Sequence, residues 1–301
     1  MTPTTTMDAL APGHPGRWSD GRVTVCHDRR EAVPVRLLGG RAPDAVTEHF
    51  RIHRTAQGLV VLHRLFPDEL DDDLAGIVSA ELGSSGLLDG PEDFRRVFTG
   101  VVRSTISEPV TAWSVFYANT LAALAHPGAT RTGGSVAAFA PVAARAKELV
   151  TGRRVLDLGS CFGFLALRLA DSGHQVIASD LCPGTVQLLA TVARRLGRSL
   201  STVVCDAARV PLADRSVDTV TMIHLLEHLD PAHGAMALAE ALRVARCRVV
   251  IAVPFEAEPT AVYGHVRTFD LADLDGLGAE TGLPYEVTEH HGGWLVIDAG
   301  P

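Results

Sequence analysis

The chain of 301 residues lacks several features that would place it in a large class of proteins at once. No stretch reaches the 18 apolar residues of a membrane span, and no charged segment followed by an apolar run opens it, so we expect a cytoplasmic protein without a membrane partner. The five cysteines are scattered and form no Cys-x-x-Cys pair, which gives no sign of a disulfide framework or a cysteine zinc site. Lys147 is the only lysine, and the net charge of −8 argues against a nucleic-acid partner, because phosphate binding needs a basic footprint.

What the chain does have is a glycine-containing turn between a short apolar run and a helix-like stretch, in residues 155–163. Gly159 and Gly163 let the backbone turn tightly and approach a ligand closely. The helix that begins near Gly163 points free N–H groups and its positive dipole end into the same space. Asp157 precedes the glycines, whereas a dinucleotide fingerprint places its acidic residue about 20 residues after the first strand. The spacing therefore disfavours a nicotinamide-dependent oxidoreductase.

The next two predicted strands also end in carboxylates. The apolar run His174–Ser179 is followed by Asp180 and Leu181, and a carboxylate at the tip of a second strand can accept both hydroxyls of a ribose. A third run, Leu200–Val204, ends in Cys205-Asp206-Ala207. Either aspartate alone could be a solvated strand end or a turn initiator. Their order along the chain favours ligand binding.

These segments resemble the class I S-adenosylmethionine-dependent methyltransferases, whose first motif is D/E-x-G-x-G-x-G. Cys161 stands here at the middle glycine, and Val210–Val220 is similar to the family's segment before its fourth strand. The resemblance implies an α/β, Rossmann-like sheet of order 3-2-1-4-5-7-6 with the last strand antiparallel. It implies S-adenosylmethionine as cofactor, with Asp206 at the adenine amino group. The cofactor-binding residues would be Asp157, Gly159, Ser160, Cys161, Gly163, Asp180, Leu181, Asp206 and Ala207.

Apolar runs alternate with helical stretches from Arg153 onward, which is typical of a parallel α/β sheet. We expect strands at 153–158, 174–179, 200–204, 217–223, 247–253, 284–290 and 293–298. We expect helices at 163–172, 184–197, 231–245 and 270–281. The methyltransferase domain would then span residues 135–301, beginning with a helix at 135–150.

The N-terminal part has a different pattern. Residues 1–20 are rich in Thr, Pro and Gly and are expected to form a disordered tail. Residues 21–134 are expected to form a cap or substrate region, with strands first and helices after them. The strands are predicted at Val23–Val25, Val35–Leu38 and Leu59–Leu62, and the helices are predicted to open at Pro67, Pro91 and Pro109.

The residues that could perform chemistry follow the fourth predicted strand. His224, Glu227 and His228 have the spacing i, i+3 and i+4, which in a helix places them on one face. His224 could be a general base. The three could instead bind a divalent metal, as in a similar E-x-x-E-H arrangement of some ubiquinone-pathway methyltransferases, or Glu227 and His228 could be structural. We expect no metal, and keep this set as the alternative.

A second candidate base, His265, lies in the segment Gly264–Phe269, which resembles a "GHVR-F" segment of the same group of methyltransferases. Arg267 in that segment could orient His265 or bind substrate. Arg131 is a further candidate, for the methionine carboxylate of the cofactor. The catalytic residues that we predict are His224 and His265.

A narrower resemblance concerns residues 60–70, 109–117 and 156–164, which look like those of the mycofactocin oligosaccharide methyltransferases. This similarity would cover residues 20–300 and implies O-methylation of a glucose on the glycan of a peptide-derived redox cofactor. Another metabolite or a quinone-like acceptor, with metal assistance, remains an alternative. So does a non-catalytic subunit that binds S-adenosylmethionine. We expect a small-molecule or oligosaccharide substrate, and the sequence leaves the oligomeric state open.

Overall fold

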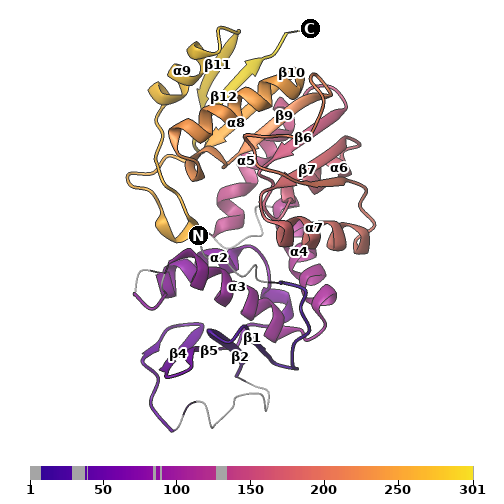
Figure 1. Cartoon of the computed structure of the whole chain (residues 1–301). Coiled ribbons are helices and arrows are strands. Elements are labelled where there is room, and N and C mark those ends of the chain that lie inside the picture. The colour runs from indigo at the N-terminus through magenta and orange to yellow at the C-terminus, as the bar shows by residue number, and fades with distance from the viewer. Residues whose placement is uncertain are drawn as a thin grey trace. The chain divides into compact units, whose positions relative to one another are not determined.

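A computed structural model describes residues 8–28, 38, 40–83, 86–88, 90–126 and 134–300 (Figure 1). The chain divides into two compact units, residues 1–137 and 138–301, whereas the predicted boundary between cap and methyltransferase domain lies between residues 134 and 135. Most of the predicted strand Val35–Leu38, and Arg131, lie outside the described residues. Among the helices that the structure describes, none combines the length and the apolar character needed to cross a bilayer.

The first unit contains a five-stranded sheet of order β1-β2-β5-β4-β3. Its strands are β1 Arg17–Ser19, β2 Val23–His27, β3 Ala45–Val46, β4 Phe50–Thr55 and β5 Gly58–His63. β2 pairs with β5 in parallel, and the other pairs are antiparallel. Strand β1 lies inside the predicted disordered tail, which was wrong for residues 17–19: Trp18 is buried there and pairs with Val25 of β2. The sequence analysis also missed β3 and β4.

The helices of the first unit begin where the sequence predicts. The helix expected after Pro67 is divided into the 3-10 turn η1 Pro67–Glu69, α2 Asp73–Val78 and the π-helical turn η2 Ser79–Gly83. Helices α3 Pro91–Thr105 and α4 Pro109–Ala125 each start with a proline, which lacks the N–H that a first turn leaves unpaired. The core of this unit includes Trp113, Phe116 and Tyr117, all fully buried.

The second unit is built on a seven-stranded sheet of order β11-β12-β10-β9-β6-β7-β8. Its strands are β6 Arg154–Leu158, β7 Gln175–Asp180, β8 Ser201–Val204, β9 Val217–Ile223, β10 Ala245–Val253, β11 Tyr285–Glu289 and β12 Gly293–Asp298. Strand β12 is antiparallel to both of its neighbours, β10 and β11, and the other described pairs of this sheet are parallel. The predicted Rossmann-like strand order is thereby confirmed.

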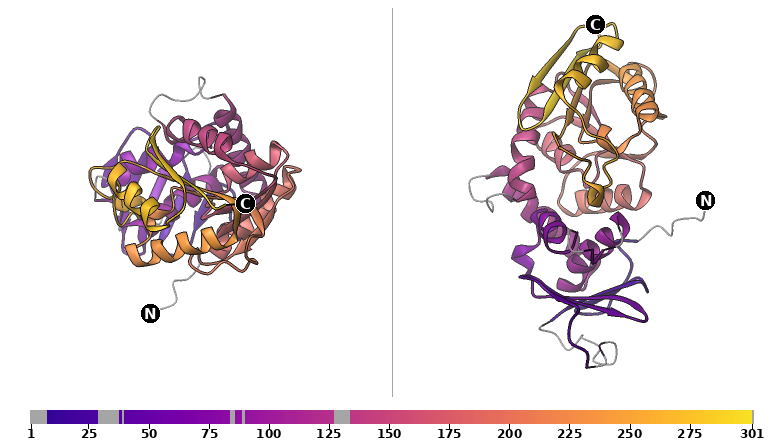
Figure 2. Two further views of the ribbon diagram at one scale, coloured as in Figure 1. Left: turned by 90° about the horizontal axis from the view of Figure 1, so that it is seen from above. Right: turned by 90° about the vertical axis from the view of Figure 1, so that its left-hand side faces the viewer.

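Helices cover both faces of this sheet. They are α5 Ser135–Leu149, which begins just before the unit boundary, α6 Phe164–Asp171, α7 Pro183–Arg195, α8 Pro231–Val244 and α9 Leu271–Glu280. Leu156, Val220 and Ile251 pack with Ala241 of α8 in one apolar cluster. Alternate residues of the strands face the opposite side, and α8 and α5 lie on opposite sides of the sheet when it is seen from above (Figure 2, left).

The parallel strands bring their carboxyl ends to one edge of this sheet. The segments that follow β6, β7, β8, β9 and β10 therefore share that edge. They include the short 3-10 helices η4 Leu226–His228 and η5 Ala261–Tyr263. Nearly all residues predicted from the sequence to bind cofactor or perform chemistry lie in these segments.

Candidate cofactor and acceptor site

The turn after β6 has left-handed backbone at each of the three glycine positions of the motif. The φ angles of Gly159, Cys161 and Gly163 are 75°, 48° and 73°. A Cβ at Gly159 would lie 2.6 Å from Cδ1 of Leu225, and one at Gly163 would lie 2.4 Å from Cδ2 of Leu189. Both positions therefore favour glycine by conformation, and a side chain at either would displace the end of a leucine side chain. Cys161 is exposed and adopts the same backbone region at a cost of about 1–2 kcal/mol.

Asp180, at the end of β7, is bonded to this turn. Its Oδ2 accepts a hydrogen bond of 3.0 Å from the N–H of Cys161, and its Oδ1 accepts one of 2.8 Å from the N–H of Cys182. The side chain remains partly exposed, and Leu181 beside it is 69% exposed. Since each carboxylate oxygen has two lone pairs, Asp180 can accept further hydrogen bonds from a ligand.

Asp157 lies behind the turn and is buried. Its carboxylate accepts a hydrogen bond of 2.7 Å from the hydroxyl of Thr221 on β9. Burial raises the pKa of Asp157 to about 6, and the charge of Asp180 acts in the same direction. Asp157 therefore supports the turn from inside the unit. Thr221 was not predicted, because its role depends on β6 and β9 being neighbours.

Asp206, after β8, is held by two donors. Its Oδ1 accepts from the N–H of Ala208 at 2.9 Å and contacts Nε2 of His233 at 2.7 Å. These two contacts, with the Ala208 N–H as the larger influence, keep the pKa of Asp206 below its usual value. His233 is a functional candidate that the sequence analysis missed. The signal for it was Asp230-Pro231, since Asp230 caps α8 by accepting from the N–H of His233 at 3.0 Å.

A histidine–glutamate cluster follows β9 and β10, and we define it as His224, Glu227, His228, Glu256 and His265. Nδ1 of His265 lies 2.7 Å from Oε2 of Glu256. The rings of His228 and His265 meet edge to face, with centroids 4.8 Å apart. Glu256 was not predicted; it lies in the loop after β10 and provides His265 with a carboxylate partner.

Glu227 is the most enclosed member of this cluster, with an exposed fraction of 1%. Neither of its carboxylate oxygens has a hydrogen-bond partner among the residues that the structure describes. Burial raises the pKa of Glu227 to about 8, and the charge of Glu256 contributes to the shift. One ligand atom from each of Glu227, His228 and His265 lies within 4.8 Å of the others. The group that could hold a metal thus contains His265 where the sequence predicted His224.

His224 is separate from that group. It precedes η4 and has a φ of 54°, so it does not share a helical face with Glu227 and His228 as predicted. Its ring meets Phe139 edge to face at 6.0 Å, and its Nε2 is buried without a partner in the described structure. Burial lowers the pKa of His224 to about 4, assisted by His265 and His228.

Arg267 has a structural role in the described structure. Its Nε donates to the carbonyl of Leu226 at 3.1 Å, and its guanidinium lies 4.3 Å from the ring centroid of Phe269. The expectation that Arg267 orients His265 is therefore not met, because Glu256 makes that contact. Arg267 instead fixes η4, and the N–H of Val266 adds a bond of 2.8 Å to the carbonyl of Glu227.

Residues 156–253 match the family model described as "Methyltransferase domain". This segment, about a third of the chain, is therefore similar to methyltransferase domains. The resemblance to class I methyltransferases implies S-adenosylmethionine as cofactor, and the strand order and the turn after β6 agree with that resemblance.

Two relatives share part of this domain. The chain is 38% identical over 128 residues to a demethylmenaquinone methyltransferase of Beutenbergia cavernae, an alignment that covers 39% of this chain and 49% of that protein. It is 36% identical over 91 residues to an uncharacterized methyltransferase of Mycobacterium bovis, covering 30% of this chain and 36% of the relative. The chain thus spans about half or less of the length of these curated relatives.

Among solved structures, a SAM-dependent methyltransferase from Aquifex aeolicus aligns with a TM-score of 0.43 and 19% identity. The alignment covers 52% of this chain and 85% of that one.

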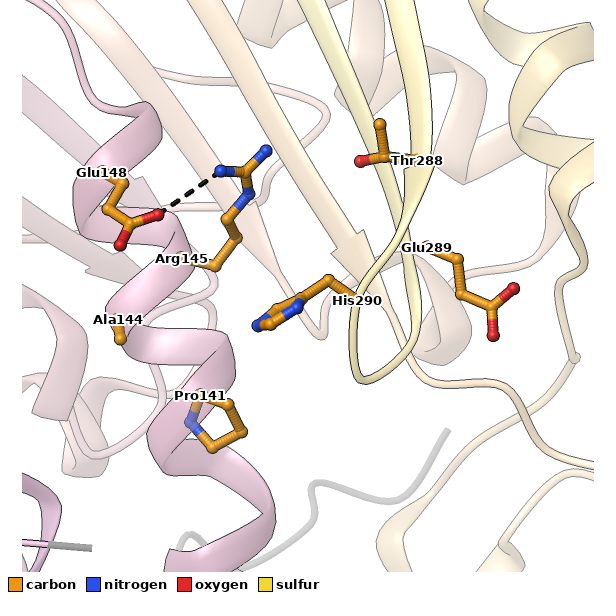
Figure 3. A pocket seen from close by; sticks show the side chains of 7 residues that line it. All are labelled: Pro141, Ala144, Arg145, Glu148, Thr288, Glu289 and His290. Carbon is orange, nitrogen blue, oxygen red and sulfur yellow. Dashed lines mark hydrogen bonds and ion pairs between the residues drawn. The ribbon is translucent and has the colours of Figure 1, made fainter.

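The second unit also has a cavity of about 500 Å³ between α5 and the end of β11 (Figure 3). It is lined by Pro141, Ala144, Arg145, Glu148, Thr288, Glu289 and His290. Arg145 and Glu148 pair with each other at 3.3 Å across one turn of α5. This lining shares no described residue with the cofactor turn or with the histidine–glutamate cluster.

Proposed function

We propose that the chain transfers the methyl group of S-adenosylmethionine to a hydroxyl oxygen of a small molecule or glycan. The observation that carries this proposal is the pair His265–Glu256, joined at 2.7 Å, at the sheet edge that also holds the cofactor turn. In the reaction the hydroxyl oxygen attacks the methyl carbon, and the carbon–sulfur bond breaks with its electron pair on sulfur. The hydroxyl proton must leave as the new bond forms, so the acceptor needs a group that activates it.

The cofactor would lie along the carboxyl ends of β6, β7 and β8. Asp180 would accept the two ribose hydroxyls, with the exposed side chain of Leu181 beside the adenine. Asp206 would accept the adenine amino group, next to Ala207. The N–H groups of the turn, supported by Asp157 from behind, would face the methionine part at Gly159, Ser160, Cys161 and Gly163.

Of the two histidines predicted as catalytic, we assign activation of the acceptor to His265. A carboxylate orients its ring, which is the arrangement that fixes a histidine tautomer for catalysis. The Nε2 of His224 is enclosed, and its low pKa makes it a weak proton acceptor. His224 therefore becomes the second candidate.

The acceptor that we propose is a glucose of the mycofactocin oligosaccharide, on the basis of the resemblance in residues 60–70, 109–117 and 156–164. A second candidate is demethylmenaquinone, because the relative from Beutenbergia cavernae carries the name of the enzyme that methylates it. The cytoplasmic location and the lack of a nucleic-acid partner remain predictions from the sequence.

Labelled methyl transfer tests this function. The purified chain is incubated with S-adenosylmethionine carrying a ¹³C methyl group and with either the oligosaccharide or demethylmenaquinone. Carbon NMR of the product separates a methoxy carbon from a methyl group on a ring carbon. We expect a methoxy signal with the oligosaccharide. Binding of S-adenosylhomocysteine without any methylated product would instead identify a non-catalytic subunit.

The same assay tests the assignment of His265. We expect His265→Ala to lower kcat by about 10²- to 10⁴-fold, the range for loss of an acid–base group, with S-adenosylhomocysteine affinity unchanged. The matched variant His224→Ala should keep most of the turnover. If His224→Ala suffers the larger loss, the roles of the two histidines are reversed.

A further inference from the structure

The environment of Glu227 calls for a partner that the described residues do not provide. A buried carboxylate normally has hydrogen bonds or a counter-charge, because desolvation without them costs several kcal/mol. Glu227 is 1% exposed, and neither of its oxygens accepts a hydrogen bond from the residues that the structure describes. The positive charge of Arg267 acts to lower the pKa of Glu227, but the Nε–H of Arg267 donates its hydrogen bond to the carbonyl of Leu226. A cation from outside the chain could therefore take the place of the proton on Glu227.

Two imidazoles stand beside this carboxylate. The ligand atoms of Glu227, His228 and His265 lie within 4.8 Å of one another. Around a tetrahedral ion with bonds of about 2.0–2.1 Å, neighbouring ligand atoms are about 3.3 Å apart. Closing the remaining gap takes side-chain adjustments on the order of 1 Å.

The outer contacts of both histidines suit metal ligation. His228 directs Nδ1 to the carbonyl of Gly264 at 3.3 Å, and His265 directs Nδ1 to Glu256 at 2.7 Å. A carbonyl or a carboxylate can only accept here, so the proton belongs on Nδ1 and the lone pair on Nε2. Histidines that bind metals show this pattern, in which a second group fixes the tautomer.

We infer that Glu227, His228 and His265 bind one divalent transition-metal cation. Two imidazoles and one carboxylate suit Mn²⁺, Co²⁺ or Zn²⁺ better than the all-oxygen sites of Mg²⁺ and Ca²⁺. The inference rests on the proposed function and states how His265 acts on the acceptor. Glu227, His228 and His265 would hold the cation, and the cation would lower the pKa of an acceptor hydroxyl beside it.

A second histidine–glutamate group, in the first unit, differs because its residues bond to each other. Glu48, His49 and Glu81 in the first unit also lie within ligand distance of one another. There, however, Oε1 of Glu81 contacts Nδ1 of His49 at 2.5 Å, and Oε2 accepts from the N–H of His49 at 3.1 Å. Both oxygens of Glu81 are thus used within the unit, which makes His49→Ala a matched control.

Titration of the metal-free chain with Co²⁺ tests the site without cofactor or acceptor. Calorimetry gives the stoichiometry, and the visible absorption of Co²⁺ reports its ligands. We expect one equivalent to bind, and Glu227→Gln, His228→Ala and His265→Ala each to lose at least roughly 100-fold in affinity. Glu256→Gln should lose about 10- to 100-fold, as for an outer group. His49→Ala should bind as the wild type does.

Each variant is accepted as folded when it binds S-adenosylhomocysteine with wild-type affinity. If Glu227→Gln fails this criterion, His228→Ala, on an exposed side chain, decides the question. The inference is overturned if the wild type binds no stoichiometric Co²⁺, or if folded Glu227→Gln or His228→Ala binds it unchanged; His265 would then take the proton directly. Stoichiometric Co²⁺ without any methylated product contradicts the proposed function and leaves the metal site standing.

Discussion

The two ends of the seven-stranded sheet use aspartate in opposite ways. At the amino end, Asp218 is the second residue of β9 and is 5% exposed. Its Oδ2 accepts from the N–H groups of Arg153 and Arg154 at 2.7 and 2.8 Å, and its Oδ1 pairs with Arg246. At the carboxyl end, Asp180 also accepts two backbone N–H groups but stays partly exposed.

The two aspartates thus differ in burial and in the number of partners within the unit. The chain closes around Asp218 so tightly that a Cβ at Gly152 would lie 2.4 Å from its Cβ. The N–H of Arg154 is the largest of several influences that hold the pKa of Asp218 below its ordinary value. At the carboxyl end, each oxygen of Asp180 accepts one hydrogen bond from a backbone N–H and those of Glu227 accept none from the described residues, so both side chains retain lone pairs.

Of the substitutions that follow, Asp180→Ala should give the largest effect, a loss of affinity for S-adenosylhomocysteine. In Asp180→Ala the two ribose hydroxyls lose a charged acceptor, and the turn loses its bond to Cys161. Hydrogen bonds to a charged group contribute about 1.5–3 kcal/mol each, so we expect S-adenosylhomocysteine to bind roughly 100-fold more weakly or worse. Isothermal titration calorimetry measures this loss.

Asp218→Ala is the matched change at the other end. It should leave the affinity for S-adenosylhomocysteine within about threefold and lower the free energy of unfolding by about 2 kcal/mol, because a charge-assisted network is lost. Urea unfolding gives the second quantity. The comparison fails if Asp218→Ala weakens ligand binding as much as Asp180→Ala does.

The sequence predicts this sheet well because each buried parallel strand is a short apolar run between helical segments. Strand β9 begins and ends at the predicted residues, 217 and 223. Strand β4 was missed, because Arg51, His53 and Arg54 make its sequence polar although Phe50 and Ile52 are buried. Helix formation after Pro67 was predicted too simply, since the chain there changes from 3-10 to α to π geometry within 17 residues.

The candidate site likewise contains residues that local sequence motifs predict and residues that they do not. Residues fixed by local motifs, such as Gly159, Gly163 and Asp180, were found because the turn itself demands them. Glu256 and His233 were not, since their partners come from other loops of the sheet edge. The spacing of i, i+3 and i+4 placed His224 on one helical face with Glu227 and His228, whereas η4 begins only at Leu226 and His265 completes the possible ligand set.

Asp157 should make the stability of the folded chain depend on pH. Its folded pKa of about 6 lies above the ordinary value of about 3.9, so the folded state binds the proton more tightly. The stabilisation from protonation therefore grows as pH falls through about 6 and is absent well above that value. Between pH 7 and pH 5 it should amount to about 1 kcal/mol, and Asp157→Asn should lack it.

The lowered pKa of Asp218 has the opposite sign, because its stabilisation is present above the ordinary aspartate pKa and is lost as pH falls further. Hydrogen exchange of β6 peptides at pH 5 and pH 7, in wild type and Asp157→Asn, isolates the contribution of Asp157. Equal pH dependence in the two proteins would mean that Asp157 does not titrate in this range.

Cys161 gives the smallest expected effect and tests whether the turn binds through backbone alone. Its φ of 48° costs an ordinary residue about 1–2 kcal/mol, whereas glycine adopts it freely but loses about 0.5–1 kcal/mol of additional chain entropy. Cys161→Gly should therefore change stability by less than about 1 kcal/mol and keep S-adenosylhomocysteine affinity within about threefold. Its N–H still reaches Asp180.

Cys161→Val, with a branched Cβ, should weaken binding more, because positive φ is strongly unfavourable for such residues. A loss of more than about tenfold in Cys161→Gly would show that the thiol itself contacts the cofactor, and the carboxyl end would then bind its ligand through side chains at this position as well.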